Sequence, residues 1–162
     1  MNESLKLVID IADEQSVIDV DSARMRLAVE HILHEASIDR AQVSVAVVDD
    51  PTIHKLNRDY LEHDYATDVL SFVLERSPEH LEGQVVVSAD TARREADCYG
   101  WPPEDELLLY VIHGALHLVG HDDTTPSSRA QMREEEKIHL GHFGLVPHWT
   151  EKPTSQQTEP EQ

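Results

Sequence analysis

The chain has 162 residues, 40% hydrophobic and 28% charged, which is typical of one soluble globular domain with a core of its own. Thirty-two acidic residues against 13 basic ones give a net charge of −19, which excludes a chain-wide basic surface for non-specific nucleic-acid binding. No apolar run approaches the roughly 20 residues of a membrane span, and we expect no secretory signal. Cys98 is the single cysteine. It excludes an intrachain disulfide and suits a reducing cytoplasm.

Two strands and a helix are predicted in the first third of the chain. Leu5–Ile11 alternates apolar and polar residues like a strand, and Gln42–Val48 is rich in β-branched residues. Between them Val20–Ser37 has helical periodicity and can be capped by Asp19 or Asp21. The apolar stripe of this helix comprises Met25, Leu27, Ala28, Ile32 and Leu33.

The middle of the chain predicts a second helix, a polar loop and two more strands. In order these are a helix from Asp49 to Tyr60, the loop Glu62–Thr67, the strand Asp68–Leu74, a break at Ser77-Pro78 and the strand Gly83–Val87. An acidic cap followed by Pro51 is typical of a helix start. Because Asp68–Leu74 is mostly apolar, we expect it to be a central strand.

The last third predicts three helices. They run from Ser88 or Asp90 to about Cys98, from Pro103 onward with acidic residues in the first turn, and from Ser127 or Ser128 to about Leu140. Because helices and strands are interleaved, we predict an α+β fold with a small mixed four-stranded sheet covered by helices. Residues 1–148 are predicted to form a single domain, and residues 149–162 a disordered polar tail.

The segment HGALHLVGHDD, which begins at His113, carries the clearest chemical pattern in the chain. If the helix continues through it, His113 and His117 lie one turn apart on one face, a spacing at which two imidazoles bind one metal ion. Gly120 lets the chain turn back. The turn can then bring Asp123 to the same ion as a third ligand, and His121 is the alternative third ligand.

The spacing H-x-x-x-H-x-x-G-x-x-D matches the zinc spacing of the metzincins with two changes. Gly114 replaces the glutamate that serves metallopeptidases as general base, which argues against a peptidase. Asp123 replaces the third histidine. A carboxylate is an ordinary zinc ligand, although its charge makes the ion a weaker Lewis acid. The pattern therefore predicts one zinc ion or another divalent metal, against the simpler interpretation of a polar helix face.

Two segments together resemble the YbeY family of bacterial endoribonucleases that mature rRNA. They are LNRDYLEHDYATDVLSF (Leu56–Phe72) and HGALHLVGHDD, and the family patterns are LNxxYRxxDxPTDVLSF and HGxLHLxGxDH. Order and spacing agree, and the resemblance extends from about Val43 to Gly144.

The resemblance implies a metalloproteinase-like (zincin-like) α+β fold with one zinc ion held on a helix and the turn after it. It implies that His113, His117 and Asp123 are the ligands. It also implies trimming of the 3′ end of small-subunit rRNA and a part in ribosome quality control, which would make rRNA and the small ribosomal subunit the partners.

The sequence departs from the family pattern at four positions. Asp123 stands in place of the third histidine, Leu61 in place of an arginine, Ala66 in place of a proline and Gln84 in place of an aspartate. An arginine in such a pocket would bind phosphate and stabilise the transition state, which a leucine cannot do. Lys55 and Arg58, earlier on the same predicted helix, are the candidate substrate-binding residues that would compensate.

The leading hypothesis is a single-strand-specific, metal-dependent endoribonuclease acting on small-subunit rRNA in the cytoplasm. His121 and Asp122 are its candidate catalytic proton carriers, His121 because an imidazole titrates near neutral pH. A solvated turn histidine is the equally simple interpretation of His121. The alternative function is a ribosome-associated binding protein whose metal is mainly structural, and Leu61, Asp123 and the net charge favour it.

Overall fold

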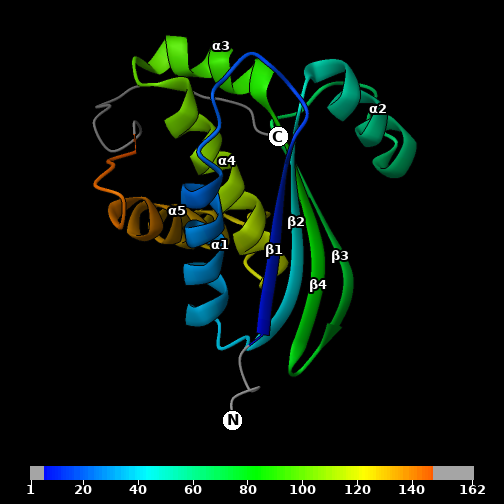
Figure 1. Cartoon of the computed structure of the whole chain (residues 1–162), viewed down its shortest axis with the longest axis vertical. Coiled ribbons are helices and arrows are strands. Elements are labelled where there is room, and N and C mark those ends of the chain that lie inside the picture. Colours follow the sequence, from blue (N-terminus) through cyan, green and yellow to red (C-terminus); the bar gives the residue numbers. More distant parts are fainter. Residues whose placement is uncertain (1–5, 148–162) are drawn as a thin grey trace.

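The computed structural model describes residues 6–147, which contain four strands and five helices. In chain order these are β1 (Lys6–Asp13), α1 (Ser22–Glu35), β2 (Arg40–Val48), α2 (Asp50–Leu61), β3 (Val69–Ser77), β4 (His80–Ser88), α3 (Ala89–Tyr99), α4 (Pro103–Leu118) and α5 (Pro126–Gly141). Figure 1 shows α1, α4 and α5 on one face of the sheet, with α2 beyond the other face and α3 across one end.

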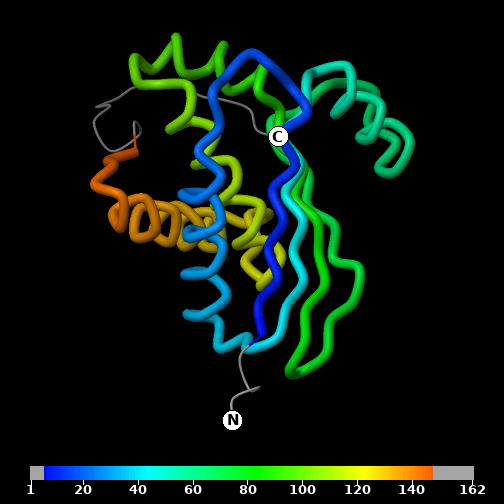
Figure 2. The backbone as a smooth tube through the Cα atoms, viewed as in Figure 1, coloured from blue at the N-terminus to red at the C-terminus, as the bar shows by residue number. Residues whose placement is uncertain are grey.

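The four strands form one mixed sheet in the order β1-β2-β4-β3. The strands β1, β2 and β4 are parallel, whereas β3 runs antiparallel to β4 and forms a hairpin with it. The tube in Figure 2 shows the hairpin at the edge of the sheet farthest from α1. The α+β class and the small mixed four-stranded sheet are thus confirmed.

The predicted central position of Asp68–Leu74 is wrong, because β3 is an edge strand. Its apolar start is covered on both faces. The partly buried Val69 lies beneath Gly114 of α4, and the buried Leu70 packs in a second apolar cluster with Ile53 of α2. Farther along β3 the side chain of Leu74 is 62% exposed. The start of β3 is therefore apolar because helices cover both of its faces. A central strand, with a neighbour on each side, gives the same apolar pattern, so the sequence alone does not distinguish the two positions.

Side-chain caps fix most helix starts where the sequence predicted them. The carboxylates of Asp21 and Asp49 and the hydroxyl of Ser88 accept backbone N–H bonds at the starts of α1, α2 and α3. The predicted cap of α5 at Ser127 or Ser128 is wrong. Thr125 caps this helix, and Ser128 returns a bond to the Thr125 backbone in a capping box.

The main core lies between the sheet and α1 and α4, and α4 is the most buried helix. Most of the predicted stripe of α1 faces this core. Leu27 does not, since it is 44% exposed, and Val29 is fully buried instead. The stripe is centred on the side of α1 that packs against α4, and Arg24 strengthens this contact by pairing with Asp105 at 3.0 Å.

Close packing at Gly114 sets the position of α4 on the sheet. A Cβ atom at Gly114 would lie 2.6 Å from Cγ1 of Val85 and 3.0 Å from Cγ2 of Val69. The hydroxyl of Ser71 donates a hydrogen bond of 3.0 Å to the Gly114 carbonyl. Only glycine lets the helix lie this near the strands, so the residue that replaces the peptidase glutamate has a packing role.

The predicted single domain 1–148 and the polar tail 149–162 reach beyond the residues that the structure describes, and the tail lies wholly outside them. Between residues 6 and 147, none of the helices combines the length and apolar character needed to cross a membrane.

Candidate metal centre

Three of the predicted site residues come together at the end of α4. The Nε2 atoms of His113 and His117 lie 3.1 Å apart. Oδ2 of Asp123 lies 3.5 Å from each of these nitrogens. All three side chains are half-buried, so their donor atoms face one small volume at the protein surface.

A glycine turn carries Asp123 back to the two histidines. After α4 ends at Leu118, Gly120 adopts a φ of +108°, a conformation that side chains rarely take. The backbone N–H groups of Gly120 and His121 close the turn on the carbonyls of the last helical turn, each at 3.0 Å. Asp122 stabilises the segment that follows the turn, since its carboxylate accepts hydrogen bonds from Asp123 N (2.8 Å) and Thr124 Oγ1 (2.6 Å).

A buried glutamate on α5 orients the first histidine. Oε2 of Glu136 lies 2.6 Å from Nδ1 of His113, and the Glu136 side chain is 1% exposed. This contact places the proton of a neutral His113 on Nδ1 and leaves Nε2 free to face His117 and Asp123. Our sequence analysis missed Glu136. Its spacing from Met132 and Leu140, both buried, was the signal that places it on the inner face of α5.

The carboxylates of Asp123 and Glu136 favour positive charge on His113. Burial disfavours a charged His113, but Asp123 and Glu136 outweigh it and raise the pKa of His113 to about 9. Conversely, His113 is the main cause that lowers the pKa of Asp123 to about 2. Burial raises the pKa of the nearby Asp68, and the charge of His113 opposes that rise.

The donor atoms fit one divalent ion. Zinc–nitrogen and zinc–oxygen bonds of about 2.1 Å in a tetrahedron place the ligand atoms roughly 3.4 Å apart. The separations of 3.1, 3.5 and 3.5 Å among His113, His117 and Asp123 match this spacing. Two imidazole nitrogens and one carboxylate oxygen are also ordinary zinc donors. Asp123, and not the alternative His121, completes the group.

The other predicted site residues are not members of this group. Lys55 and Arg58 both pair with Asp59 of their own helix α2, at 2.6 and 3.5 Å. His121 lines a neighbouring pocket between α1 and α5. Asp122 is exposed and belongs to the turn described above.

Three arginines contact the segments around the cluster. Arg76 of β3 donates to the carbonyl of Leu118 at the end of α4. Arg129 donates to the carbonyl of Asp123 at 3.4 Å. Arg133 donates to Oε1 of Glu136, also at 3.4 Å. No sequence pattern brings β3 beside the Gly120 turn, so Arg76 could not have been found without the fold.

A family model described as "Endoribonuclease YbeY" matches residues 10–144, which include every residue of this cluster. The chain belongs to the YbeY family. The resemblance found in the sequence is thereby confirmed.

Curated YbeY relatives span most of the chain. The Endoribonuclease YbeY of Rhodopirellula baltica is 45% identical over 130 residues, 78% of this chain and 67% of that protein. The Endoribonuclease YbeY of Bacillus licheniformis is 35% identical over 158 residues, 87% of this chain and 98% of that protein.

The fold of this YbeY protein also has a solved counterpart. The solution structure of TM1509 from Thermotoga maritima superposes with a TM-score of 0.57 at 23% identity, covering 92% of this chain and 100% of that one. This likeness supports the predicted zincin-like α+β architecture of a YbeY protein.

Proposed function

We propose that this YbeY protein is a metal-dependent endoribonuclease that processes small-subunit rRNA. The observation that carries the proposal is the convergence of His113 Nε2, His117 Nε2 and Asp123 Oδ2 within 3.5 Å of one another, in a chain that belongs to this family. The names of its relatives, endoribonucleases throughout those quoted above, support the reaction class.

His113, His117 and Asp123 would hold one divalent ion, which we propose to be zinc. When bound, such an ion supplies the Lewis-acid chemistry that phosphodiester cleavage needs. Glu136 keeps His113 in the tautomer that presents Nε2, because its buried carboxylate faces Nδ1 at 2.6 Å. Asp123 stays ionised at any pH near neutrality, because its pKa is lowered to about 2.

Substrate phosphates would meet the arginines that surround this group. Arg76, Arg129 and Arg133 are exposed and come from two elements that flank the Gly120 turn. A guanidinium can bind two phosphate oxygens at once. Lys55 and Arg58 remain proposed contacts for a longer strand.

Proton transfer is assigned to the two residues that precede Asp123. Hydrogen bonding from Thr124 lowers the pKa of Asp122, so Asp122 is ionised near neutral pH and can accept a proton there. We propose His121 as the proton donor, because an imidazole can give up a proton held on a ring nitrogen.

Single-stranded rRNA is the proposed substrate. A duplex presents one charge per roughly 1.7 Å of its axis, about twice the density of one strand. A chain with a net charge of −19 repels the denser polymer more strongly. A single strand can also bend one phosphate toward a small site. Such a substrate implies work at the small ribosomal subunit in the cytoplasm, and ribosome quality control would use the same activity.

The alternative function is a ribosome-associated binding protein with a mainly structural metal. The observation that favours it is Leu61, where the family pattern has an arginine. This side chain is 42% exposed at the end of α2 and brings no charge to a substrate.

Cleavage of an oligonucleotide copied from the 3′ end of small-subunit rRNA separates the two functions. We expect the purified protein to cleave it. The His117→Ala variant should lose the ion bound at this cluster and at least about 100-fold in rate. His54→Ala, which removes an imidazole from α2, is the matched control and should behave like the unmodified protein. Equal cleavage by His117→Ala, or none by the metal-loaded protein, would favour the binding role.

A further inference from the structure

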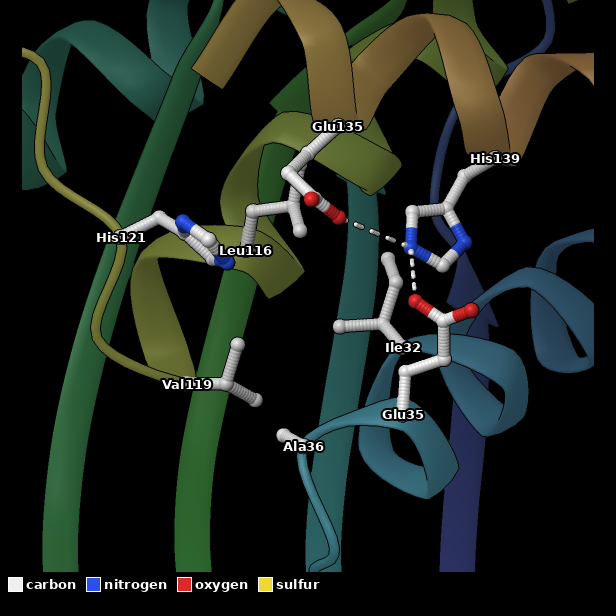
Figure 3. A pocket seen from close by; sticks show the side chains of 8 residues that line it. All are labelled: Ile32, Glu35, Ala36, Leu116, Val119, His121, Glu135 and His139. Atoms are coloured by element: carbon white, nitrogen blue, oxygen red, sulfur yellow. Dashed lines mark ion pairs between the residues drawn. The ribbon is translucent and has the colours of Figure 1, made fainter. Parts of the chain in front are cut away.

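A second group of potential ligands lies between α1 and α5. Figure 3 shows Glu35, the last residue of α1, opposite Glu135 and His139, which are one turn apart on α5. Oε1 of Glu35 lies 3.6 Å from Nε2 of His139, and Oε1 of Glu135 lies 3.7 Å from the same nitrogen. The three donor atoms all lie within 4.8 Å of one another.

The imidazole of His139 is buried without the hydrogen bonds that burial normally requires. Its side chain is 1% exposed, and its Nδ1 has no hydrogen-bond partner within residues 6–147. Its Nε2 points between the two carboxylates (Figure 3), yet both distances exceed the usual range of 2.7–3.2 Å for such a bond. A polar group without a partner in the interior is costly. An ion bound at Nε2 would give that nitrogen the partner that the two carboxylates, at 3.6 and 3.7 Å, do not.

The gap has the size and charge of a cation site. Ligand atoms around a zinc-sized ion lie roughly 3.4 Å apart, close to the 3.6 and 3.7 Å found here. Glu35 and Ala36 stand at the C-terminal end of α1, where the helix dipole disfavours a carboxylate and favours a cation. The three side chains line a pocket of about 140 Å³, which leaves room for water ligands.

We propose that Glu35, Glu135 and His139 bind a second divalent metal ion, of the zinc or manganese class, that joins α5 to α1. The ligand set of two carboxylates and one imidazole suits these ions. Burial also lowers the pKa of His139, which keeps its nitrogen available to a metal near neutral pH. The proposal does not rest on the proposed nuclease activity, since none of these three ligands belongs to the cluster on α4.

The second ion would act on the first site through α5. Glu135 is the neighbour of Glu136, whose carboxylate orients His113. His121, in the turn that carries Asp123, lines the same pocket as Glu135 and His139. An ion that fixes α5 against α1 therefore also fixes one side of the first cluster. This is a positioning role, and none of the three ligands is assigned contact with RNA.

Metal stoichiometry of the full chain tests the proposal. Apo-protein prepared with a chelator is dialysed against zinc chloride, passed through a desalting column and analysed for bound zinc. We expect about two equivalents for the unmodified protein and about one each for Glu35→Gln and Glu135→Gln. Glu134→Gln makes the same change one residue away on the exposed side of α5 and should retain two.

The His117→Ala variant separates this proposal from the nuclease proposal. It should keep about one equivalent, and the double variant His117→Ala/Glu35→Gln should keep almost none. Glu35 is 53% exposed, so its substitution leaves the fold intact. One equivalent in the unmodified protein that His117→Ala abolishes would overturn the second site alone. A second equivalent that survives in both Glu35→Gln and Glu135→Gln would overturn it as well.

Discussion

At the residue scale, Asp123 is one of the positions where this protein departs from the family pattern. It brings a charge to a position where the family pattern has an imidazole, and its side chain is 37% exposed, so a larger group has room there. We expect Asp123→His to bind one ion at this site at least as tightly, because three neutral imidazoles are a familiar zinc set. Asp123→Ala should weaken binding at least about 10-fold. Competition with a chromophoric chelator measures both affinities, and a metal-free Asp123→His protein would contradict the assignment.

Glu136 permits a sharper test, because it touches the first site through His113 and not through the ion. Glu136→Gln keeps the size of the side chain and removes its charge. We expect a 10–100-fold loss of metal affinity, as is usual for such supporting carboxylates. The pKa of His113 in the apo-protein should also fall below about 9, because Glu136 is one of the causes that raise it.

The imidazole signals of the apo-protein in an NMR titration give that pKa directly. Glu134→Gln on the exposed face of the same helix is the control and should change neither quantity. If Glu136→Gln left both the pKa of His113 and the metal affinity unchanged, Glu136 would be a buried acid without influence on the site.

At the element scale, the seating of α4 on the sheet depends on Gly114. Gly114→Ala would place Cβ 2.6 Å from Val85 Cγ1, closer than real contacts allow, and 3.0 Å from Val69 Cγ2. Val85 and Val69 both belong to strands of the sheet, which restricts how far they can move. We expect a loss of about 1–3 kcal/mol in the free energy of unfolding, typical of overpacking. Gly141→Ala, at the end of α5 with no atom within 4 Å of the new Cβ, should be neutral or slightly stabilising. Urea denaturation of the two apo-variants compares them.

Asp50 joins two helices and gives a pH-dependent contribution. Its carboxylate accepts bonds from Ser88 Oγ (2.6 Å), Thr91 Oγ1 (2.8 Å) and Arg94 (2.9 Å). Burial opposes ionisation, but these bonds prevail and lower the pKa of Asp50 below 3.8. A depressed folded-state pKa gives stability that is present above the unfolded value and is lost as the pH falls through the folded value.

We therefore expect Asp50→Asn to lose about 1.5–3 kcal/mol at neutral pH, the range for hydrogen bonds to a charged group. The difference from the unmodified protein should shrink as the pH falls below about 4. Thermal melts at several pH values measure it. A difference that stays constant down to pH about 2 would show that the charge of Asp50 contributes nothing.

Sequence patterns predicted elements with a strong local cause and failed where the cause was distant. Pro103 favours the start of α4, and Gly120 permits the turn after this helix, because each residue restricts or frees its own backbone angles. The edge position of β3 depends on which strand lies beside it, and a run such as Asp68–Leu74 contains no record of that. The same holds for Glu136, since its partner His113 is 23 residues away.

At the scale of the whole molecule, a net charge of −19 has to coexist with a polyanionic substrate. The structure places Arg76, Arg129 and Arg133 in contact with the segments around the first cluster, whereas Lys55 and Arg58 pair with Asp59. Attraction is therefore local, and repulsion comes from the rest of the surface. RNA should be held by few phosphate contacts and approach slowly at low salt.

Salt dependence of RNA binding by the metal-free protein measures the number of those contacts without cleavage. Each phosphate contact on a single strand contributes about −0.7 to the slope of log K against log salt. Three arginines predict a slope no steeper than about −2, and screening of the overall repulsion makes it shallower still. Arg129→Ala should reduce the slope by about 0.7. Lys55→Ala, which removes an exposed cation from α2, should leave the slope unchanged for an oligonucleotide too short to reach α2.

Fluorescence anisotropy with a labelled oligonucleotide from the 3′ end of small-subunit rRNA gives each slope. A slope steeper than about −4 would require more phosphate contacts than the arginines beside the cluster can provide. If Lys55→Ala changed the slope and Arg129→Ala did not, the RNA would run along α2, where the sequence placed it, and not along α5. The chemistry at the metal cluster would be the same in either case, but the RNA would reach the cluster from the face of the sheet that carries α2 (Figure 1).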